Sequence, residues 1–220
     1  MSDLVIGMGE VGRALAQFLD CLGRDITPRD SGQTDIPDTI HIAFPWSSTF
    51  VEEVLVYERL YSPNLVIVHS TIPVGTCDPH GWVHSPVRGR HPDLVYALRM
   101  FTKPFGGPRA REVSWPSSDV SFYPRARDTE AGKLWELAQF GLQVRITQAI
   151  YEWCEKNNVD PEIAYRMFAY EYNQGYKGIG DSRFARPVLD YVPGDIGGHC
   201  VSQNMAFLDH TIARVVEEGF

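Results

Sequence analysis

The architecture of this chain can be read outward from the segment Leu4-Val5-Ile6-Gly7-Met8-Gly9-Glu10-Val11-Gly12. The three apolar residues at its start predict a short buried strand, and apolar residues recur at helical spacing over residues 11–22. Between the strand and the helix, the glycines follow the pattern G-x-G-x-x-G, which is typical of a sharp strand-to-helix turn. This order of elements predicts the first unit of a doubly wound α/β fold.

The glycine-rich turn has the features of a dinucleotide site. Gly7 permits the tight turn, Gly9 leaves room for a pyrophosphate, and Gly12 lets the helix pack on the strand, while the helix N-terminus faces negative charge. A second strand is expected at residues 25–29, so that Asp30 ends it where an acid accepts ribose hydroxyls. This acid favours NAD over NADP, although Arg29 beside it is of the type that accepts a 2′-phosphate. A turn without a cofactor, and one that binds S-adenosylmethionine, stay as alternatives.

Further strands and helices extend this pattern. Strands are expected at residues 39–45, 65–70, 81–85 and 103–106, with a helix at 49–60, which indicates a parallel sheet built from βαβ units. After a polar, proline-containing stretch at 114–124, a long helix is expected from Asp128 or Thr129 to about 157. A helix at 160–172, a loop at 175–198 and a last helix at 203–218 follow. The sequence therefore predicts a Rossmann-type doubly wound parallel sheet in residues 1–125 and a helical domain, for dimerisation and substrate binding, in residues 126–220.

Composition excludes several classes of function. The 220 residues carry a formal net charge of −8, and no basic stripe suited to nucleic acid or to a membrane surface is visible. No run of about 18 apolar residues predicts a membrane span. The four cysteines lie far apart without a C-x-x-C pair, which favours a reducing compartment, the cytoplasm, over a disulfide framework. His80 and His84 are four residues apart, but Gly81 and Trp82 between them argue against a helix, so no metal site is expected.

Four motifs in chain order resemble those of the nucleotide-sugar 6-dehydrogenases, the family of the UDP-glucose, GDP-mannose and UDP-N-acetylmannosamine dehydrogenases. They are Ser70-Thr71-Ile72-Pro73-Val74-Gly75-Thr76, Glu130-Ala131-Gly132-Lys133-Leu134, Asp181-Ser182-Arg183 and Gly197-Gly198-His199-Cys200. The resemblance implies two NAD-dependent oxidations of a primary alcohol to a carboxylate. It also implies a homodimer through the long helix at 129–157.

The resemblance also implies roles for single residues. Cys200 would capture the intermediate aldehyde as a thiohemiacetal, Lys133 would stabilise an oxyanion, and Thr71 would lie near the nicotinamide. Arg183 would reach the site of the neighbouring subunit, and Gly197, Gly198 and His199 would line the substrate loop. The expected cofactor contacts are Gly7, Met8, Gly9, Glu10, Val11, Gly12, Asp30, Pro45, Ser70 and Thr71.

Several positions depart from the family pattern. Val87 stands in place of a glutamate, Leu137 in place of an asparagine, Asn204 in place of an aspartate and Asp195 in place of a glycine. None of the first three replacements can move a proton or bind an oxyanion as the family residue would. We also expect the family's nucleotide-binding third domain to be absent. These changes leave three hypotheses open: a dehydrogenase that performs one oxidation or uses a smaller substrate, an NAD-binding pseudoenzyme, and one half of a split enzyme.

Overall fold

The computed structural model describes residues 2–25, 36–90, 92–196 and 199–219 of the chain. These residues form two compact units, Met1–Lys133 and Leu134–Phe220, which are considered separately below. The domain boundary expected at 125/126 lies at the start of the long helix α4 (Ala126–Lys156), whereas the two units meet within that helix. The first turns of α4 therefore belong to the sheet unit.

In its described residues, the first unit contains one sheet of seven strands. Their order is β2-β1-β3-β4-β5-β6-β7, and every neighbouring pair is parallel except β5 with β6. Strand β1 lies between β2 and β3. The chain therefore extends the sheet first on one side of β1 and then on the other, which is the doubly wound arrangement predicted from the sequence. The strands are β1 (Asp3–Ile6), β2 (Leu22–Arg24), β3 (Thr39–Ile42), β4 (Leu65–Val68), β5 (Val83–His84), β6 (Lys103–Gly106) and β7 (Val120–Tyr123).

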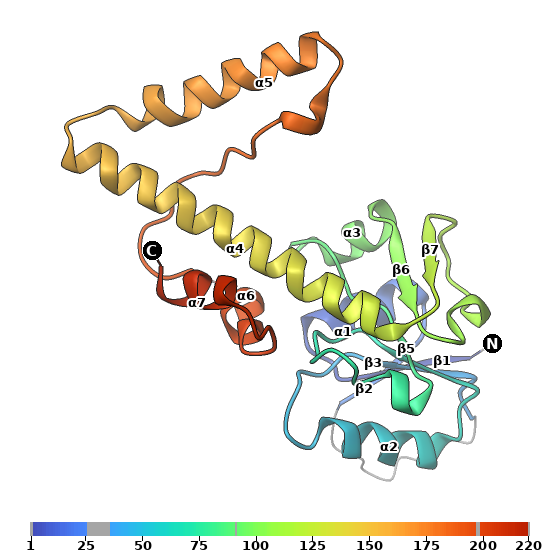
Figure 1. Cartoon of the computed structure of the whole chain (residues 1–220). Helices are drawn as coiled ribbons and strands as arrows, with labels where there is room; N and C mark the ends of the chain where they lie inside the picture. Colours follow the sequence, from blue (N-terminus) through green and yellow to red (C-terminus); the bar gives the residue numbers. More distant parts are fainter. Residues whose placement is uncertain (1, 26–35, 91, 197–198, 220) are drawn as a thin grey trace. The chain divides into compact units, whose positions relative to one another are not determined.

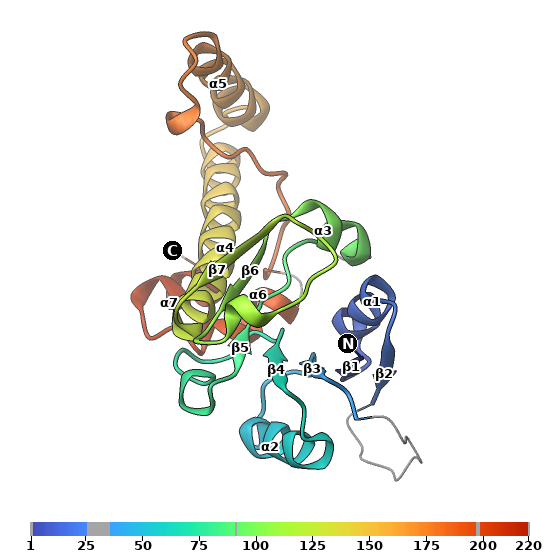
Figure 2. The ribbon, with the colours of Figure 1, turned by 90° about the vertical axis from the view of Figure 1, so that its right-hand side faces the viewer.

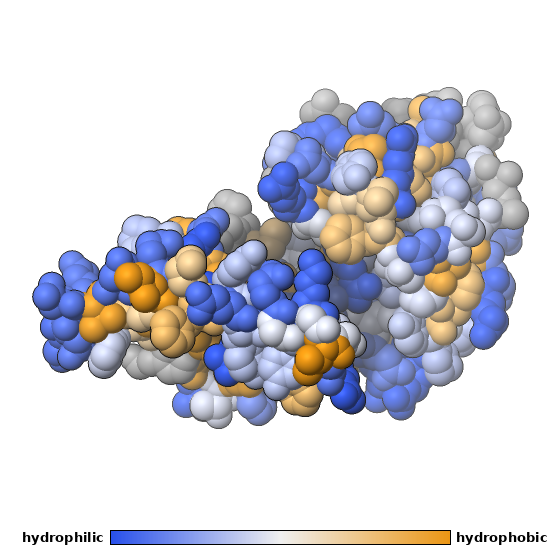
Figure 3. Space-filling view, turned by 90° about the horizontal axis from the view of Figure 1, so that it is seen from above, coloured by the Kyte–Doolittle hydropathy of each residue, from blue (hydrophilic) through white to orange (hydrophobic). Residues whose placement is uncertain are grey.

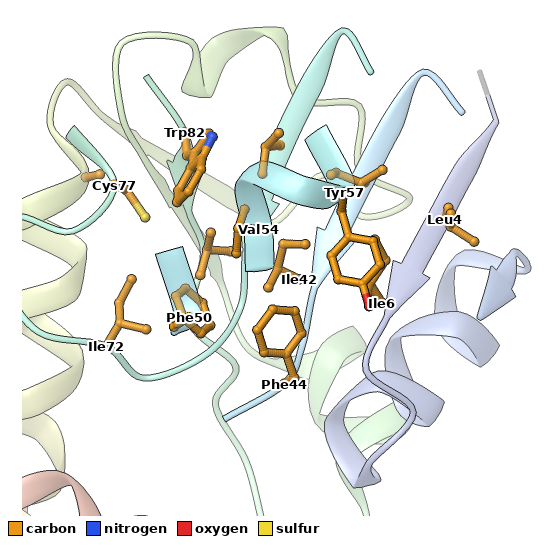
Figure 4. Packing of buried hydrophobic residues seen from close by; sticks show 14 residues of the cluster. Leu4, Ile6, Ile42, Phe44, Phe50, Val54, Tyr57, Ile72, Cys77 and Trp82 are labelled. Carbon is orange, nitrogen blue, oxygen red and sulfur yellow. The ribbon is translucent and has the colours of Figure 1, made fainter. Parts of the chain in front are cut away.

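Helices cover both faces of this sheet. Helix α2 (Phe50–Tyr61) lies on one face, and α1 (Glu10–Leu19) and α3 (Leu94–Met100) lie on the other (Figures 1 and 2). Beneath α2, apolar side chains of the strands interlock with Phe50, Val54 and Tyr57 (Figure 4). Strands β3 and β4 are buried along their whole length, as expected for parallel strands covered on both sides.

The second unit is helical in its described residues. It contains the rest of α4, a π-helical turn at Glu162–Met167 that continues into α5 (Phe168–Gly178), a 3₁₀ turn at Ser182–Phe184, α6 (His199–Met205) and α7 (Thr211–Glu218). The core joins α4 to the two last helices, and a Cβ added to Gly141 would lie 2.5 Å from Val216. The buried members of this core are Leu137, Ala138, Ile196, Val201, Met205, Ala213 and Val216.

Several elements differ from the sequence predictions. Strand β2 at Leu22–Arg24 was not expected, and of the expected strand at 25–29 only Asp25 lies within the described residues. The polar stretch at 114–124 contains β7, and its pairing with β6 does not follow from the local sequence. Helix α3 was not predicted. The single helix expected at 203–218 is two helices, because the side chain of His210 accepts a hydrogen bond from the Ile212 amide and begins α7.

No helix in the described parts of the chain combines the length and apolarity needed to cross a membrane.

Candidate functional site

The turn after β1 has the close packing that its glycines predict. Gly7 has a φ of +95°, and a Cβ there would lie 2.8 Å from the Phe44 amide nitrogen. A Cβ on Gly12 would lie 1.7 Å from the Gly7 carbonyl oxygen, so only glycine lets α1 approach the strand this closely. Gly9 differs, since no atom lies within 4 Å of its hypothetical Cβ. The turn therefore offers free space at the N-terminus of α1, where Gly9 is the N-cap and no side chain caps the helix.

Arg13 adds a cation to this turn that sequence reasoning did not single out. Its guanidinium Nη1 donates a hydrogen bond of 2.7 Å to the Met8 carbonyl oxygen, and the side chain is exposed. Gly9 and Glu10 are exposed and Met8 and Val11 are partly buried, whereas Gly7 and Gly12 are buried. An anion above the turn would meet helix amides and a guanidinium together.

The carboxyl ends of β3 and β4 lie beside the turn and are tied to each other. Ser70 Oγ donates a hydrogen bond of 2.5 Å to the Phe44 carbonyl oxygen. Pro45, which follows Phe44, is exposed, and Thr71, which follows Ser70, is partly exposed. The structure thus places Ser70, Thr71 and Pro45 at the edge where ligands bind in doubly wound sheets.

A buried histidine contacts the backbone of Ser70. His84 Nε2 lies 3.1 Å from the Ser70 carbonyl oxygen, and His84 Nδ1 lies 2.9 Å from Thr129 Oγ1. Burial lowers the pKa of His84 to about 3, so the ring is neutral. A neutral ring satisfies both contacts when Nε2 donates to Ser70 and Nδ1 accepts from Thr129. From the sequence, His84 stands out only as a possible metal ligand. Its hydrogen bond to Thr129 cannot be predicted from the sequence, because the two residues are 45 positions apart.

Glu130 holds the loop that follows Thr71. Its carboxylate accepts hydrogen bonds from the backbone amides of Gly75, at 2.5 Å, and Cys77, at 2.9 Å. The residue is fully buried, and burial raises its pKa. Burial also raises the pKa of the Cys77 thiol well above its ordinary value, with the carboxylate of Glu130 as a further cause. Glu130 of the second motif therefore anchors the loop of the first motif, a contact that the sequence does not predict.

Lys133 lies one turn further along α4. Its Nζ donates a hydrogen bond of 3.0 Å to the carbonyl oxygen of Val87. The side chain of Val87 is only 9 % exposed and packs with Val5, Leu15 and Leu94 of the sheet unit. The valine that replaces a family glutamate is therefore a core residue, and Lys133 contacts its backbone.

The remaining predicted residues belong to the second unit or lie outside the described residues. Cys200 is exposed on the first turn of α6, and Asn204 Nδ2 donates a hydrogen bond of 2.7 Å to the Cys200 carbonyl oxygen. Leu137 is buried in the core of the second unit. Arg183 is exposed and pairs with Asp181 at 2.7 Å, which raises the pKa of Arg183. Gly197, Gly198 and Asp30 lie outside the described residues, as does the side chain of His199.

The end of β2 offers a second acid beside the turn, while Asp30 lies outside the described residues. The amide of Gly7 donates a hydrogen bond of 2.8 Å to the Arg24 carbonyl oxygen, so β2 ends beside the turn at Arg24. Asp25 follows directly and is exposed. The acid nearest to the end of the described strand is thus Asp25.

The described part of the chain contains no group of three or more His, Cys, Asp or Glu side chains that could hold a metal ion.

Solved structures show the fold class. No protein-family model matches the sequence, and no curated protein sequence matches it. The structure is similar to UDP-D-ManNAc dehydrogenase from Pyrococcus horikoshii, with a TM-score of 0.72 and 15% identity over 98% of this chain and 67% of that one. It is also similar to NDP-N-acetyl-D-galactosaminuronic acid dehydrogenase from Methanosarcina mazei, with a TM-score of 0.65 and 18% identity over 98% of this chain and 65% of that one. This chain spans about two thirds of the length of both enzymes.

A smaller dehydrogenase shares the same fold. The 3-hydroxyisobutyrate dehydrogenase of Mycobacterium tuberculosis has a TM-score of 0.67 and 14% identity, over 98% of this chain and 90% of that one. The fold is accordingly that of Rossmann-type dehydrogenases with a long helix after the sheet. The resemblance to nucleotide-sugar dehydrogenases, drawn from four sequence motifs, is confirmed at the level of the fold.

Proposed function

We propose that this chain binds NAD at the carboxyl edge of its sheet unit and oxidises an alcohol or an aldehyde. The observation that carries the proposal is the turn at Gly7–Gly12, where Gly7 and Gly12 are required by packing and Gly9 is not. Free space beside Gly9 at a helix N-terminus, with the Arg13 guanidinium bound to the carbonyl oxygen of Met8 in the same turn, fits a pyrophosphate. Asp25, at the end of β2, would accept the ribose hydroxyls in place of Asp30.

Bound NAD would supply the acceptor for a hydride from the substrate. Thr71 would contact the nicotinamide side of the cofactor. The preceding residue, Ser70, is held at the sheet edge by its hydrogen bonds with Phe44 and with the neutral His84. Lys133 would donate a hydrogen bond to the substrate oxygen, because its ammonium already lies at this edge beside Val87. Val87 and Leu137 bring no polar group, and an ammonium that donates to the substrate oxygen cannot accept its proton, so the proton lost by an alcohol would have to pass to water.

Cys200 would act only if the reaction continues beyond the aldehyde. Its exposed thiol would add to the aldehyde carbon as a thiolate, and the thiohemiacetal oxygen would take up a proton. Loss of a hydride from that carbon to a second NAD, together with loss of the hydroxyl proton to water, would give a thioester, which water hydrolyses to the carboxylate and the free thiol. Arg183 and the segment Gly197, Gly198 and His199 would contact the substrate in this scheme.

Calorimetric titration with NAD, followed by turnover assays with UDP- and GDP-sugars, tests the proposal. Cys200→Ala should abolish carboxylate formation and leave NAD binding unchanged, while the control Cys21→Ala in α1's C-terminal flank should change neither. Carboxylate formation that survives Cys200→Ala would remove the nucleophile from the mechanism. Absence of NAD binding would refute the proposal as a whole, and competition by S-adenosylmethionine would replace it with a methyltransferase.

A second candidate function is the oxidation of a small hydroxy acid. It is favoured by the likeness to a 3-hydroxyisobutyrate dehydrogenase, of which 90% is matched, and by the apolar residues Val87 and Leu137 in place of polar family residues. A single alcohol oxidation needs Lys133 but no nucleophile. Turnover of 3-hydroxy acids that is insensitive to Cys200→Ala would establish this function instead. NAD binding without turnover of either substrate class would indicate a pseudoenzyme or one half of a split enzyme.

We also propose that the chain forms a homodimer through α4, in the cytoplasm, where its four free cysteines would stay reduced. Ile146, Ala149, Ile150 and Trp153 follow the spacing of a helical seam and line an open cavity of about 450 Å³. Trp153 is 59 % exposed, and hydrophobic side chains interrupt the hydrophilic surface of the helical unit in Figure 3. A seam of this kind is self-complementary under a twofold axis.

The dimer is tested by light scattering on the purified chain. Trp153→Glu should convert a dimer to a monomer, whereas Glu152→Gln, on the neighbouring position of α4, should leave it unchanged. A monomeric wild-type chain, or a dimer that survives Trp153→Glu, would refute an interface through this seam.

A further inference from the structure

A row of polar side chains crosses the sheet of the first unit on the face beneath α1 and α3. His41 of β3 stands beside Val5 of β1 and Ile67 of β4 in the strand register. Its Nδ1 lies 2.9 Å from Nε2 of His69, and Nδ1 of His69 lies 3.2 Å from Nζ of Lys103, the first residue of β6. At the other end, His41 Nε2 lies 3.8 Å from the Asp3 carboxylate of β1. The first two contacts are within hydrogen-bond distance and the third is at ion-pair distance, so the four groups form one row.

The interior of this row is closed to solvent. His41, His69 and Lys103 are each 3 % exposed or less, whereas the Asp3 side chain is 25 % exposed. The Trp115 ring lies over the row, with its centroid 6.4 Å from His41, 6.1 Å from His69 and 5.4 Å from the Lys103 ammonium nitrogen. Protons can therefore enter the row from water at Asp3.

The hydrogen atoms of the row can be counted from its acceptors. Lys103 Nζ donates to the carbonyl oxygens of Ser85, at 2.8 Å, and Pro86, at 3.0 Å. If Lys103 is a neutral amine, both of its hydrogens are used there, and His69 Nδ1 donates to Ser85 at 2.7 Å. His69 Nε2 must then accept from His41 Nδ1. This arrangement leaves His41 Nε2 without a hydrogen, facing a carboxylate 3.8 Å away, and no hydrogen-bond partner lies within reach of this buried nitrogen.

One added proton turns His41 Nε2 into a donor that faces the Asp3 carboxylate. If Lys103 is an ammonium, its third hydrogen goes to His69 Nδ1. The ring of His69 then carries its hydrogen on Nε2 and donates to His41 Nδ1. His41 in turn carries its hydrogen on Nε2 and faces the Asp3 carboxylate. Both arrangements keep the rings neutral, and they differ by one proton and by the direction of the hydrogen bonds along the row. In the second arrangement His69 Nδ1 no longer donates to Ser85, so their 2.7 Å contact should lengthen.

We propose that Asp3, His41, His69 and Lys103 form a buried proton chain that takes up one proton at the Asp3 end and stores it on Lys103. A proton arriving at His41 Nε2 releases the Nδ1 hydrogen of His41 to His69 Nε2. His69 then releases its own Nδ1 hydrogen to Lys103 Nζ. The row gains one proton and one positive charge, and no covalent bond other than N–H changes. The inference goes beyond the proposed dehydrogenase function and does not depend on it.

The electrostatic surroundings support a proton that is loosely held. Burial is the largest cause that lowers the pKa of Lys103 well below its ordinary value, and the charges of Lys133 on α4 and Arg88 after β5 act in the same direction. Burial also lowers the pKa of His41 and His69, while Asp3 raises that of His41 and the buried His84 of β5 lowers that of His69. Trp115 opposes these effects, since its ring face attracts the ammonium. The stored proton is thus one that the folded chain releases at far lower pH than an exposed lysine does.

The position of the row gives the stored charge an effect on the sheet edge. Lys103 binds the Ser85 and Pro86 carbonyl oxygens, and Lys133 binds the next one, that of Val87. His69 directly precedes Ser70 and Thr71. A proton that enters at Asp3 therefore places a charge beneath the segment on which the candidate site stands.

Long-range ¹H–¹⁵N correlation spectra of the full-length, uniformly labelled chain test the proposal, recorded from about pH 5 to about pH 9. Ring-nitrogen shifts report which nitrogen of each histidine carries the hydrogen. We expect His41 and His69 to stay neutral and to exchange Nδ1–H for Nε2–H together, with one shared midpoint. A ring that keeps one tautomer throughout, or two rings that become imidazolium with separate midpoints, would overturn the proposal.

Three variants sharpen this test. Lys103→Met removes the proton store, so both rings should keep the Nδ1–H form at every pH. Asp3→Asn removes the terminal carboxylate and should move the shared midpoint down by about one pH unit. Asp20→Asn, an exposed carboxylate of the same unit outside the row, should leave the midpoint unchanged. Tautomer exchange that persists in Lys103→Met would refute storage on Lys103, and the wild-type titration alone remains decisive if that variant does not fold.

Discussion

The Nζ atom of Lys133 donates a hydrogen bond of 3.0 Å to the carbonyl oxygen of Val87, whose side chain points into the core of the sheet unit. Lys133 matches the motif of the nucleotide-sugar dehydrogenases, whereas Val87 departs from it. The lysine of the family motif is present, and where a glutamate is expected the chain offers only a backbone carbonyl. The lysine is therefore the proton-carrying side chain to test first at this edge.

Lys133→Met should lower kcat/KM for the oxidised substrate by about 100-fold or more, because an oxyanion donor contributes about this much. Stability should fall by only about 1 kcal/mol, since one hydrogen bond is lost. Steady-state kinetics and urea unfolding measure the two effects. Lys156→Met, at the exposed end of the same helix, is the matched control and should change neither. An unchanged kcat/KM in Lys133→Met would show that the lysine is structural.

Gly9→Ala and Gly12→Ala should separate cofactor binding from folding. The Cβ in Gly9→Ala would meet no protein atom, so the melting temperature should hardly change, while the methyl group would occupy the space of the pyrophosphate and weaken NAD binding at least tenfold. The Cβ in Gly12→Ala would overlap the Gly7 carbonyl oxygen and should cost about 1–3 kcal/mol of unfolding free energy or more. Calorimetry and thermal unfolding distinguish the two. Equal melting temperatures for both variants would contradict the packing described for the turn.

The stability of the chain should fall in acid through His84. Its pKa is lowered from 6.5 to about 3, so the unfolded chain binds a proton that the folded chain does not bind between these values. The free energy of unfolding should accordingly be highest above pH 6.5 and should decline as the pH falls through this window, by about 1.4 kcal/mol per pH unit for this residue.

His84→Gln is the variant that tests this slope. A glutamine amide keeps a donor for the Ser70 carbonyl oxygen but does not titrate. Urea unfolding at several pH values should show a slope that is smaller than in the wild type by one proton. An unaltered slope would mean that His84 is not the titrating group.

Leu137→Asn, which restores the residue of the family pattern, should not restore chemistry. Leu137 is buried among apolar side chains of the second unit, so an amide there would lack partners and leave a cavity. We expect a loss of about 3 kcal/mol of unfolding free energy or more, without a gain in kcat. Gln139→Asn, at an exposed position of α4, is the control for helix propensity. A stable Leu137→Asn variant with raised kcat would contradict this assignment to the core.

The parts of the site that could be predicted are those whose chemistry is local in sequence. The turn at Gly7–Gly12, the strand that ends before Ser70 and the long helix that carries Lys133 were predicted at these positions, because each depends on neighbours a few residues away. Strand β2 was displaced, since a three-residue edge strand with exposed side chains has too few apolar positions to show a period. Strand β7 was missed for a related reason, because its stability comes from pairing with β6.

By itself, the sequence determined the doubly wound sheet, its glycine-rich turn and the long helix after it, because apolar periodicity and glycine sterics act over a few residues. Only the tertiary structure decided that His84 supports Ser70, that Glu130 anchors the loop after Thr71, and that Val87 and Leu137 are core residues. It also assembled Asp3, His41, His69 and Lys103 into one row. The physical reason is register: a period of two tells which face of a strand a side chain takes, and only the pairing of strands tells which side chain stands beside it.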